Sequence, residues 1–408
     1  MSGDGGASAD GVAPARTQVG IVGAGPAGLL LAHLLHRAGV DAVVVEARDR
    51  AYVEGRIRAG VLEGGTAETL REAGVGGRMD REGLVHGGIE LRFAGRGHRV
   101  DLAGLTGGRT VTVYGQHEVV RDLVAARLGA GLPLVFGAEG VALHGLADGE
   151  GRPRITWTGA DGSPRALECD LVAGCDGFHG ASRRSVPRGA LKVYERAYPF
   201  AWLGVLAEAP PPHEELIYAR HERGFALASM RSPTISRLYV QCPPDDEAEH
   251  WSDDRVWSEL TTRLEGSGAK VTEGRILQKG VTPMRSFVAE PMRHGRLFLC
   301  GDAAHIVPPT GAKGMNLAVA DVRVLARAMA ARLREGRSDL LDAYSATCLA
   351  RVWKVQRFSW WMTAMLHRFD GDDPFEHRVQ LAELDYVARS RAAATTLAEN
   401  YVGLPFDA

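Results

Sequence analysis

The sequence predicts an α/β protein in which a Rossmann-like domain with a parallel sheet is joined to an antiparallel-sheet domain and a helical C-terminal region. A buried strand pattern at residues 17–22, a helical pattern at 26–38 and a second strand pattern at 43–45 form a βαβ unit, which is typical of a parallel sheet. Short, partly alternating apolar runs from about residue 197 onward favour an antiparallel sheet. After residue 317 the pattern is mostly helical.

These patterns divide the chain into five predicted segments. A tail rich in Gly, Ala, Ser and Asp is expected to be disordered and has no signal-peptide pattern. This tail covers residues 1–15, and the Rossmann-like domain covers 16–192. The antiparallel sheet covers 193–284, the chain returns to the first domain at 285–332, and the helical region covers 333–408.

Composition excludes several classes of function. The 408 residues carry a net charge of −2 and no long basic run, so neither nucleic acid nor an anionic membrane is an expected main partner. The longest apolar region, 21–35, is too short for a membrane span and is broken by Gly and Pro. Five scattered cysteines without a C-x-x-C pair argue against a metal site or a dithiol centre, and they suit a reducing cytoplasm.

The turn between the first strand and the first helix carries the first functional signal. Gly23, Gly25 and Gly28 form G-x-G-x-x-G, and Glu46 ends the next strand. The first glycine makes the tight turn, the second lets a pyrophosphate approach the backbone, and the third lets helix and strand pack closely. The helix N-terminus attracts phosphates, and Glu46 would accept a hydrogen bond from a ribose hydroxyl. The sequence therefore predicts a dinucleotide site.

Two further strand-end motifs decide which dinucleotide is expected. Asp176-Gly177 follows the strand in "DLVAGCDGFHGASRRS", and Gly301-Asp302 follows the strand in "GRLFLCGDAAHIVPPTGAKGMNLA". With these motifs in this order, the chain resembles the class A FAD-dependent monooxygenases. The resemblance implies tightly but non-covalently bound FAD, whose ribityl chain contacts Asp302, and a region at Asp176 and Gly177 that FAD and a nicotinamide cofactor both pass. A single G-x-G-x-x-G and the lack of a cysteine pair argue against a disulfide reductase.

Longer motifs narrow the resemblance to the 4-hydroxybenzoate 3-monooxygenase subfamily. They include "YVEGRIRAGVLEGG", "GLVHGG", "ELIYA", "RGFALAS", "FSWWMT", "LHRF" and "ENYVGLP", spread over residues 16–406. The resemblance implies that 4-hydroxybenzoate, NADPH or NADH, and O₂ give 3,4-dihydroxybenzoate through a flavin hydroperoxide. Arg231 would clamp the substrate carboxylate, because a guanidinium matches a carboxylate bidentately. Ser229 and Tyr239 would add hydrogen bonds, and Met230 would line the pocket.

A proton relay is implied at the other end of the substrate. By resemblance Tyr218 contacts the substrate hydroxyl, Tyr401 contacts Tyr218, and His86 connects the relay to solvent. The backbone carbonyl of Pro309 would face the same hydroxyl. Tyrosine passes a proton without holding charge for long, and a histidine with an ordinary pKa of about 6.5 suits the outer end.

The same resemblance assigns flavin contacts and surface contacts. The further flavin contacts are Ala27, Arg56, Ile57, Arg58, Ala59, Gly60, Val61, Gln116, Gly314, Met315 and Asn316. Among them Arg58 would help decide whether the flavin ring lies in the site or swings out. The candidate NAD(P)H contacts are Arg48, Tyr52, His179, Arg183 and Arg285, for each of which a solvated surface role is the alternative.

Some features leave alternatives open. Ala47-Arg48 stands where family members that prefer NADPH often carry Arg-Gln, so NADH is an alternative co-substrate. Trp360-Trp361 and the apolar C-terminal helices predict a homodimer face, with core packing as the alternative. A hydroxylase for another para-hydroxylated aromatic acid and a non-catalytic FAD-binding or ligand-sensing module are the competing functions.

Overall fold

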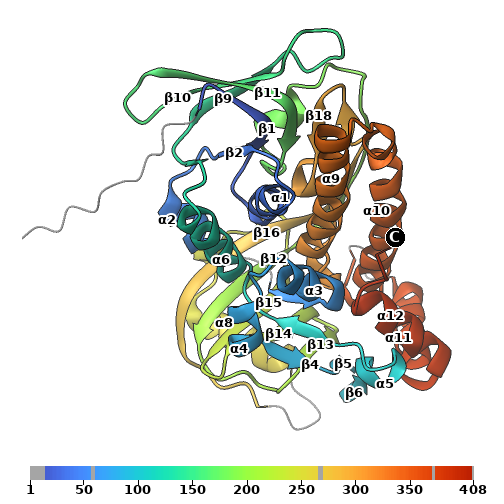
Figure 1. The fold of residues 1–408 in the computed structure, drawn as a ribbon. Coiled ribbons are helices and arrows are strands. Elements are labelled where there is room, and N and C mark those ends of the chain that lie inside the picture. Colours follow the sequence, from blue (N-terminus) through green and yellow to red (C-terminus); the bar gives the residue numbers. More distant parts are fainter. Residues whose placement is uncertain (1–13, 57–59, 265–269, 370–372, 407–408) are drawn as a thin grey trace, which may run out of the picture.

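The computed structural model describes residues 14–56, 60–264, 270–369 and 373–406. Within these ranges two large sheets lie one above the other, and long C-terminal helices run along their side (Figure 1). The α/β fold class with a parallel sheet, an antiparallel sheet and a helical C-terminal region is confirmed. The five segment boundaries stay a prediction.

The first sheet holds the parallel strands. In the described residues its order is β17-β18-β11-β1-β2-β8, with β10 paired to β11 and β9 paired to β10. Its strands are β1 (Arg16–Val22), β2 (Ala42–Val45), β8 (Leu134–Val135), β9 (Glu139–His144), β10 (Arg154–Thr158), β11 (Pro164–Gly174), β17 (Arg293–His294) and β18 (Leu297–Leu299). Strand β1 is parallel to β2 and β11, and β11 is parallel to β18. Helix α1 (Pro26–Arg37) packs against α6 (Gln116–Gly129) and α9 (Gly314–Glu335).

The second sheet is antiparallel except where β13 pairs with β5 in parallel. Its order is β19-β16-β12-β15-β14-β13-β5-β6. The strands are β5 (Ile89–Phe93), β6 (Arg96–Val100), β12 (Lys192–Glu208), β13 (Leu216–His221), β14 (Gly224–Ser232), β15 (Ile235–Cys242), β16 (Arg275–Glu290) and β19 (His305–Ile306). One face packs against α8 (Asp253–Leu264), and the other meets the C-terminal helices. Strands β5 and β6 join this sheet from a much earlier part of the chain.

Smaller elements complete the fold. Strands β3 (Val61–Glu63) and β4 (Leu84–His86) flank β7 (Val111–Val113). The short helices are α2 (Arg50–Gly55), α3 (Gly64–Glu72), α4 (Gly77–Glu82), α5 (Leu102–Leu105) and α7 (Ala181–Arg184), and the C-terminal helices are α10 (Asp339–Leu366), α11 (Pro374–Arg389) and α12 (Arg391–Tyr401). None of the helices in the described ranges is long and apolar enough to cross a membrane.

A buried carboxylate on α9 joins the two large sheets. Asp321 accepts a hydrogen bond from the backbone N–H of Gly301, which follows β18, at 3.0 Å. The same oxygen lies 2.7 Å from Nε2 of His305, which lies on β19 at the edge of the second sheet. Burial opposes a positive charge on His305, but the facing carboxylate outweighs it and raises the histidine pKa. The pair therefore holds the turn between the sheets most firmly while His305 is charged.

We expect this link to make stability depend on pH. A histidine whose pKa is raised on folding contributes stability that is fully present below its unfolded pKa of about 6.5 and is lost as pH rises through the folded pKa. His305→Gln keeps a donor for Asp321 but removes the titratable proton. The gap in thermal midpoint between the FAD-free native protein and this variant should therefore narrow as pH rises from about 5.5 to about 9. A gap that stays constant across a calorimetric pH series would contradict the assignment.

Candidate active site

The three glycines of the first turn differ in the space around them. Gly23 has a left-handed φ of 103°, which favours glycine. A Cβ on Gly28 would collide with the carbonyl oxygen of Gly23, whereas a Cβ on Gly25 would meet nothing within 4 Å. The Glu46 carboxylate accepts backbone N–H groups from Ala24 at 2.7 Å and from Arg48 at 2.8 Å. The turn is thus closed on its strand side and open at Gly25, as backbone approach by a pyrophosphate requires.

The carboxyl ends of β1, β11 and β18 meet at this turn. One carboxylate oxygen of Asp176 accepts the N–H of Ser182 at 2.8 Å, while Oδ1 is buried without a hydrogen-bond partner. Burial raises the pKa of this carboxyl group. Gly177 has a φ of 73°, and a Cβ there would meet nothing within 4 Å. An unsatisfied acceptor beside open backbone fits a ligand that brings hydroxyl donors.

The Gly301-Asp302 motif lies against the first helix. A Cβ on Gly301 would lie 3.7 Å from the side chain of Ala27 on α1 and 3.1 Å from that of Ala318 on α9. Asp302 follows in a short 3-10 helix, Gly301–Ala303, and is partly exposed. The three motifs that are far apart in the sequence therefore converge, because parallel strands end at one edge of a sheet.

Two buried tyrosines face each other between the second sheet and α12. The hydroxyl of Tyr218 on β13 lies 2.7 Å from the hydroxyl of Tyr401 at the end of α12. Their side chains are 1% and 2% exposed, and burial raises the pKa of each hydroxyl. Both hydroxyls therefore stay protonated at neutral pH and can each donate one hydrogen bond while accepting another.

The His86 side chain and the Pro309 carbonyl complete the predicted relay set. In the described residues neither group forms a hydrogen bond with the hydroxyls of Tyr218 and Tyr401. His86 is buried on β4, and its Nδ1 has no hydrogen-bond partner. Burial lowers the pKa of His86, although the charge of Glu215 opposes this effect. Pro309 is exposed, and its carbonyl oxygen accepts the N–H of Ala312 at 2.8 Å.

A group of polar side chains lies on β14 and β15. Nη1 of Arg231 donates to Oγ of Ser229 at 3.2 Å and to the carbonyl of Met230 at 2.9 Å. Arg237 donates through Nε to the hydroxyl of Tyr239 at 3.2 Å. Burial raises the pKa of Tyr239, but the guanidinium groups of Arg237 and Arg231 outweigh it and lower the pKa below its usual value. The group therefore places two guanidinium groups beside one tyrosine hydroxyl.

One cross-strand row connects the tyrosine pair with this group. Tyr218 on β13 is opposite Leu227 on β14, which in turn is opposite Tyr239 on β15. Neighbouring strands lie about 4.8 Å apart, so the backbones of the two tyrosines are separated by about 10 Å. The row sets a fixed spacing between a neutral hydroxyl end and a cationic end.

Sequence reasoning missed a buried ion pair beside the relay. Nζ of Lys313 lies 2.6 Å from the carboxylate of Glu63 and donates to the carbonyl of Tyr401 at 2.9 Å. The lysine is 1% exposed and the glutamate 4%. Burial lowers the pKa of Lys313, while the carboxylate of Glu63 opposes the shift. The signal was present in the sequence as a lysine between two glycines, "GAKG", but its burial could not be read there.

Comparison with known proteins identifies the family. A family model described as an FAD binding domain matches residues 16–359. The chain is 51% identical over 393 residues to p-hydroxybenzoate hydroxylase of Acinetobacter baylyi, covering 96% of each chain. It is 30% identical to a 3-(3-hydroxy-phenyl)propionate/3-hydroxycinnamic acid hydroxylase of Mycobacterium avium, covering 80% of this chain and 57% of that protein. The chain belongs to the class A flavoprotein hydroxylases.

The fold agrees with that family. The crystal structure of p-nitrophenol 4-monooxygenase from Pseudomonas putida matches with a TM-score of 0.82 at 21% identity, covering 96% of this chain and 100% of that one. The predicted family and its FAD cofactor are confirmed. The open Gly25 turn and the unsatisfied Asp176 oxygen fit that cofactor. The roles of the individual site residues stay predictions.

In this hydroxylase several predicted flavin residues surround the start of α9. The side chain of Asn316 donates to the carbonyl of Val61 at 3.0 Å and accepts the N–H of Glu63 at 3.0 Å. Gly314 begins α9, and a Cβ there would meet nothing within 4 Å, while Met315 is buried beside it. Asn316 thus fixes β3 against α9.

Five other predicted flavin residues lie nearby or outside the described ranges. Gly60 lies against the guanidinium of Arg231, since a Cβ there would lie 3.1 Å from its central carbon. Gln116 begins α6 and is partly exposed. Residues Ile57, Arg58 and Ala59 lie outside the described residues, so the predicted role of Arg58 in flavin movement is untested.

The predicted NAD(P)H contacts form two separate groups. The guanidinium of Arg48 lies 5.3 Å from the ring centre of Tyr52, and that of Arg56 lies 5.5 Å from the same ring. This group is exposed beside Glu46, at the adenosine end of the dinucleotide turn. It can receive a phosphate or a ribose from solvent.

The second group surrounds the ring of Phe178. The guanidinium groups of Arg183 and Arg285 lie 4.6 Å and 4.7 Å from its centre, and exposed His179 meets its edge. Arg183 also donates to the carbonyl of Ala303 at 2.9 Å. Arg183 therefore braces the Gly301–Asp302 turn, whereas His179 remains accessible.

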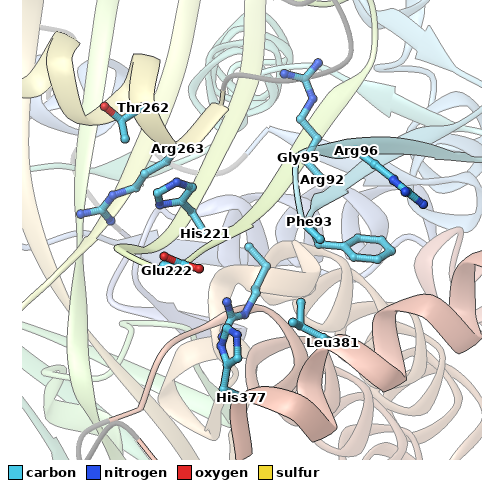
Figure 2. A pocket seen from close by; sticks show the side chains of 12 residues that line it. Arg92, Phe93, Gly95, Arg96, His221, Glu222, Thr262, Arg263, His377 and Leu381 are labelled. Atoms are coloured by element: carbon cyan, nitrogen blue, oxygen red, sulfur yellow. The ribbon is translucent and has the colours of Figure 1, made fainter. Parts of the chain in front are cut away.

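A separate cavity of about 380 Å³ lies between β5, β6, the end of β13 and α11. Its basic lining residues are Arg92, Arg96, Arg220, Arg263, His221 and His377. Figure 2 shows the guanidinium groups of Arg92, Arg96 and Arg263 pointing in different directions. Arg92 and Arg263 are paired with Glu90 and Glu259. The charges do not converge on one position, so this cavity does not compete with the tyrosine row as the active site.

The glycine turn generates a paired test. Gly28→Ala places a methyl group against the Gly23 backbone, so we expect the FAD-free variant to lose about 1–3 kcal/mol of stability. Gly25→Ala should leave the thermal midpoint of the FAD-free protein unchanged but weaken FAD retention, because its methyl group enters the ligand side of the turn. Calorimetry and flavin absorbance after gel filtration measure the two effects. If Gly28→Ala and Gly25→Ala showed the same thermal midpoint and the same FAD retention, the separate packing and ligand roles of the two glycines would be refuted.

Proposed function

We propose that this protein hydroxylates 4-hydroxybenzoate to 3,4-dihydroxybenzoate, using FAD, NAD(P)H and O₂. The observation that carries the proposal is the row from Tyr218 to Tyr239. One end offers a neutral hydroxyl pair, and the other offers two arginines and a tyrosine. A benzoate with a para hydroxyl matches both ends of the row, because its carboxylate and its hydroxyl lie at opposite ends of the ring. The two tyrosines of the row lie on β13 and β15, which are separated by β14. The name of the Acinetobacter baylyi relative supports the same substrate.

The carboxylate end would be held by Arg231, Ser229 and Tyr239. A guanidinium gives a carboxylate two parallel hydrogen bonds, and a hydroxyl group adds a third. Burial lowers the pKa of Arg231, which means that the buried guanidinium charge is costly and that a substrate carboxylate would offset this cost. Met230, buried in the same apolar cluster as Tyr218, would exclude water from this end.

The phenol end would be activated by proton transfer along the tyrosine pair. A deprotonated hydroxyl group makes the ring more electron-rich, and the neighbouring ring carbon more nucleophilic. Tyr218 accepts the phenol proton as its own proton passes to Tyr401, so neither tyrosine stores a charge. Lys313, bound to the Tyr401 carbonyl, supplies a nearby positive charge that favours the phenolate. His86 is the proposed outer acceptor, because its Nδ1 is buried without a hydrogen-bond partner in the described residues.

The cofactor residues have separate proposed tasks. FAD, when bound, takes two electrons from the nicotinamide and delivers one oxygen atom of O₂ to the ring. The open turn at Gly25 would receive its pyrophosphate, Glu46 a ribose hydroxyl, and Asp302 the ribityl chain. The carbonyl of Pro309 would border the substrate hydroxyl. Arg48 and Tyr52 would receive the adenosine end of NADH or NADPH.

We further propose that the protein is a cytoplasmic homodimer. One face of α11 exposes Phe375, Val379 and Tyr386, which are 73%, 51% and 57% exposed. Their spacing places them on one stripe of the helix. Trp361 is only partly exposed and bonds to Glu383, whereas Trp360 is 45% exposed. A second copy covering this stripe would remove a contiguous apolar surface from water.

Steady-state turnover tests the proposed activity. NAD(P)H oxidation should accelerate with 4-hydroxybenzoate, and the product should be 3,4-dihydroxybenzoate, with NADH and NADPH assayed separately. Hydroxylation of a different para-hydroxylated acid in a substrate panel would move the assignment to that acid. Peroxide as the only product with every acid would overturn the proposal.

Removing one relay hydroxyl separates flavin reduction from hydroxylation. In Tyr218→Phe the ring packing remains, so we expect 4-hydroxybenzoate still to stimulate NAD(P)H oxidation. The substrate proton then has no path to Tyr401, and hydroxylation should fall by about 10²–10⁴-fold while peroxide rises. Product and peroxide are measured per NAD(P)H consumed. A fully coupled variant would rule out the relay role of Tyr218.

Removing the carboxylate clamp should act on binding. We expect Arg231→Ala to weaken 4-hydroxybenzoate binding by about 2–5 kcal/mol, since a buried charged group loses its partner. Phenol, which has no carboxylate, serves as the matched ligand and should bind the variant and the native protein equally. An unchanged dissociation constant for 4-hydroxybenzoate, measured by flavin absorbance titration, would exclude the clamp.

A further inference from the structure

The five residues after α12, Val402–Phe406, form an ordered segment that we call the C-terminal strap. Val402 is fully buried, and its N–H donates to the carbonyl of Ala398 at 2.9 Å. Arg109 donates to the carbonyl of Gly403. The strap starts directly at Tyr401, so its position is coupled to the relay tyrosine by the covalent chain.

Arg351 on α10 holds the outer half of the strap. It donates to the carbonyl of Pro405 at 2.9 Å and to that of Leu404 at 3.0 Å. The same guanidinium lies 3.5 Å from the carboxylate of Glu63. Its side chain is only 14% exposed, so the guanidinium itself is largely shielded from solvent, although the contact with Pro405 lies at the surface. One arginine thus connects the strap to the buried ion pair.

The ring of Phe406 anchors the end of the strap. It lies between two guanidinium groups, 4.8 Å from Arg323 on α9 and 4.7 Å from Arg351 on α10. Cation–π contacts of this kind contribute about 0.5–2 kcal/mol each. Gly65 lies so close to the ring that a Cβ there would collide with it. The ring is therefore held on several sides and fixes the strap over β3.

Gly403 closes the strap over the ion pair. Its φ is 93°, and a Cβ there would overlap the carboxylate of Glu63. The carboxylate is bonded to Lys313, which holds the carbonyl of Tyr401. A ring of contacts therefore runs from Tyr401 along the strap to Arg351 and returns through the ion pair to Tyr401.

We propose that the C-terminal strap positions the relay tyrosine and keeps the Glu63–Lys313 pair dry, with Arg351 and Phe406 as its positioning residues. The proposal rests on the proposed function, because it assigns the strap to the coupling of hydroxylation to NAD(P)H use. Release of the strap admits water to the ion pair. The pair then attracts more weakly, since charges interact less in a higher dielectric. The hydrogen bond from Lys313 to the Tyr401 carbonyl weakens, and the hydrogen bond between the hydroxyls of Tyr401 and Tyr218 is lost part of the time.

The test uses four variants of the full-length holoenzyme. Phe406→Ala removes the anchoring ring, and Phe406→Tyr restores a ring between the two guanidinium groups. Arg351→Lys retains a positive charge near Glu63 but cannot hold two strap carbonyls in a fork. Arg165→Gln, on the distant hairpin of β10 and β11, is the control for loss of a surface arginine. All measurements are made well below the unfolding midpoint of each variant.

Two readouts separate positioning from general stability. Hydrogen exchange of peptides covering residues 398–406, in the holoenzyme, reports strap release and should be roughly tenfold faster in Phe406→Ala and Arg351→Lys. Product formed per NAD(P)H consumed should fall by about twofold or more in the same two variants, with the dissociation constant of 4-hydroxybenzoate unchanged within about twofold. Phe406→Tyr and Arg165→Gln should match the native protein in both readouts.

The outcomes distinguish the two proposals. Native protein that forms no 3,4-dihydroxybenzoate overturns the proposed function, and the strap proposal falls with it. Native protein that is coupled, together with equally coupled Phe406→Ala and Arg351→Lys variants, overturns the strap proposal alone. Faster exchange with unchanged coupling also overturns it, because the strap would then contribute only stability. If Arg351→Lys behaves like the native protein, the positive charge near Glu63, rather than the two hydrogen bonds to the strap carbonyls, holds the strap. That result would overturn the positioning role given to the Arg351 guanidinium.

Discussion

The buried ion pair between Lys313 and Glu63 is the interaction on which the active-site region depends. It joins the loop before α9, strand β3 and, through the Tyr401 carbonyl, the end of α12. Desolvating two charges is costly, and loss of one partner would leave the other buried at a cost of about 3–5 kcal/mol. The pair is therefore weak evidence for extra stability but strong evidence for a fixed arrangement of these three segments. Without it, the relay tyrosine would have no charged anchor.

The two sheets divide the work, and α9 connects them. The first sheet ends in backbone turns that suit a dinucleotide, whereas the second presents side chains that suit an aromatic acid. Asp321 links the strand ends of both sheets, and Asn316 at the start of the same helix holds β3. Because one helix carries both contacts, a shift at the flavin turn would be transmitted to the substrate row. This arrangement keeps the cofactor and substrate groups in a constant relation.

Local rules predicted the parts of the site that depend on backbone. Gly23, Gly25 and Gly28 could be assigned from spacing alone, because each role follows from the absence of a Cβ. The tyrosine, arginine and histidine assignments needed the family resemblance, since no local pattern brings Tyr218 to Tyr401. Lys313 and Arg351 were missed for the same physical reason. Their shared partner Glu63 lies 250 residues from Lys313 and 288 residues from Arg351 in the sequence. A buried charge looks the same as a solvated one until the fold is known.

For the proposed substrate, the spacing of the cross-strand row would favour para substitution over other patterns. Strand separation, rather than side-chain flexibility, sets the distance of about 10 Å between the backbones of Tyr218 and Tyr239. A ring placed above Leu227 can reach both ends only if its polar groups lie opposite each other. A meta hydroxyl would point along the strands, where it would leave the Tyr218 hydroxyl bonded to Tyr401 but without a hydrogen bond to the substrate. Loss of one hydrogen bond to the substrate would cost about 0.5–1.5 kcal/mol, so the proposed row would discriminate between isomers.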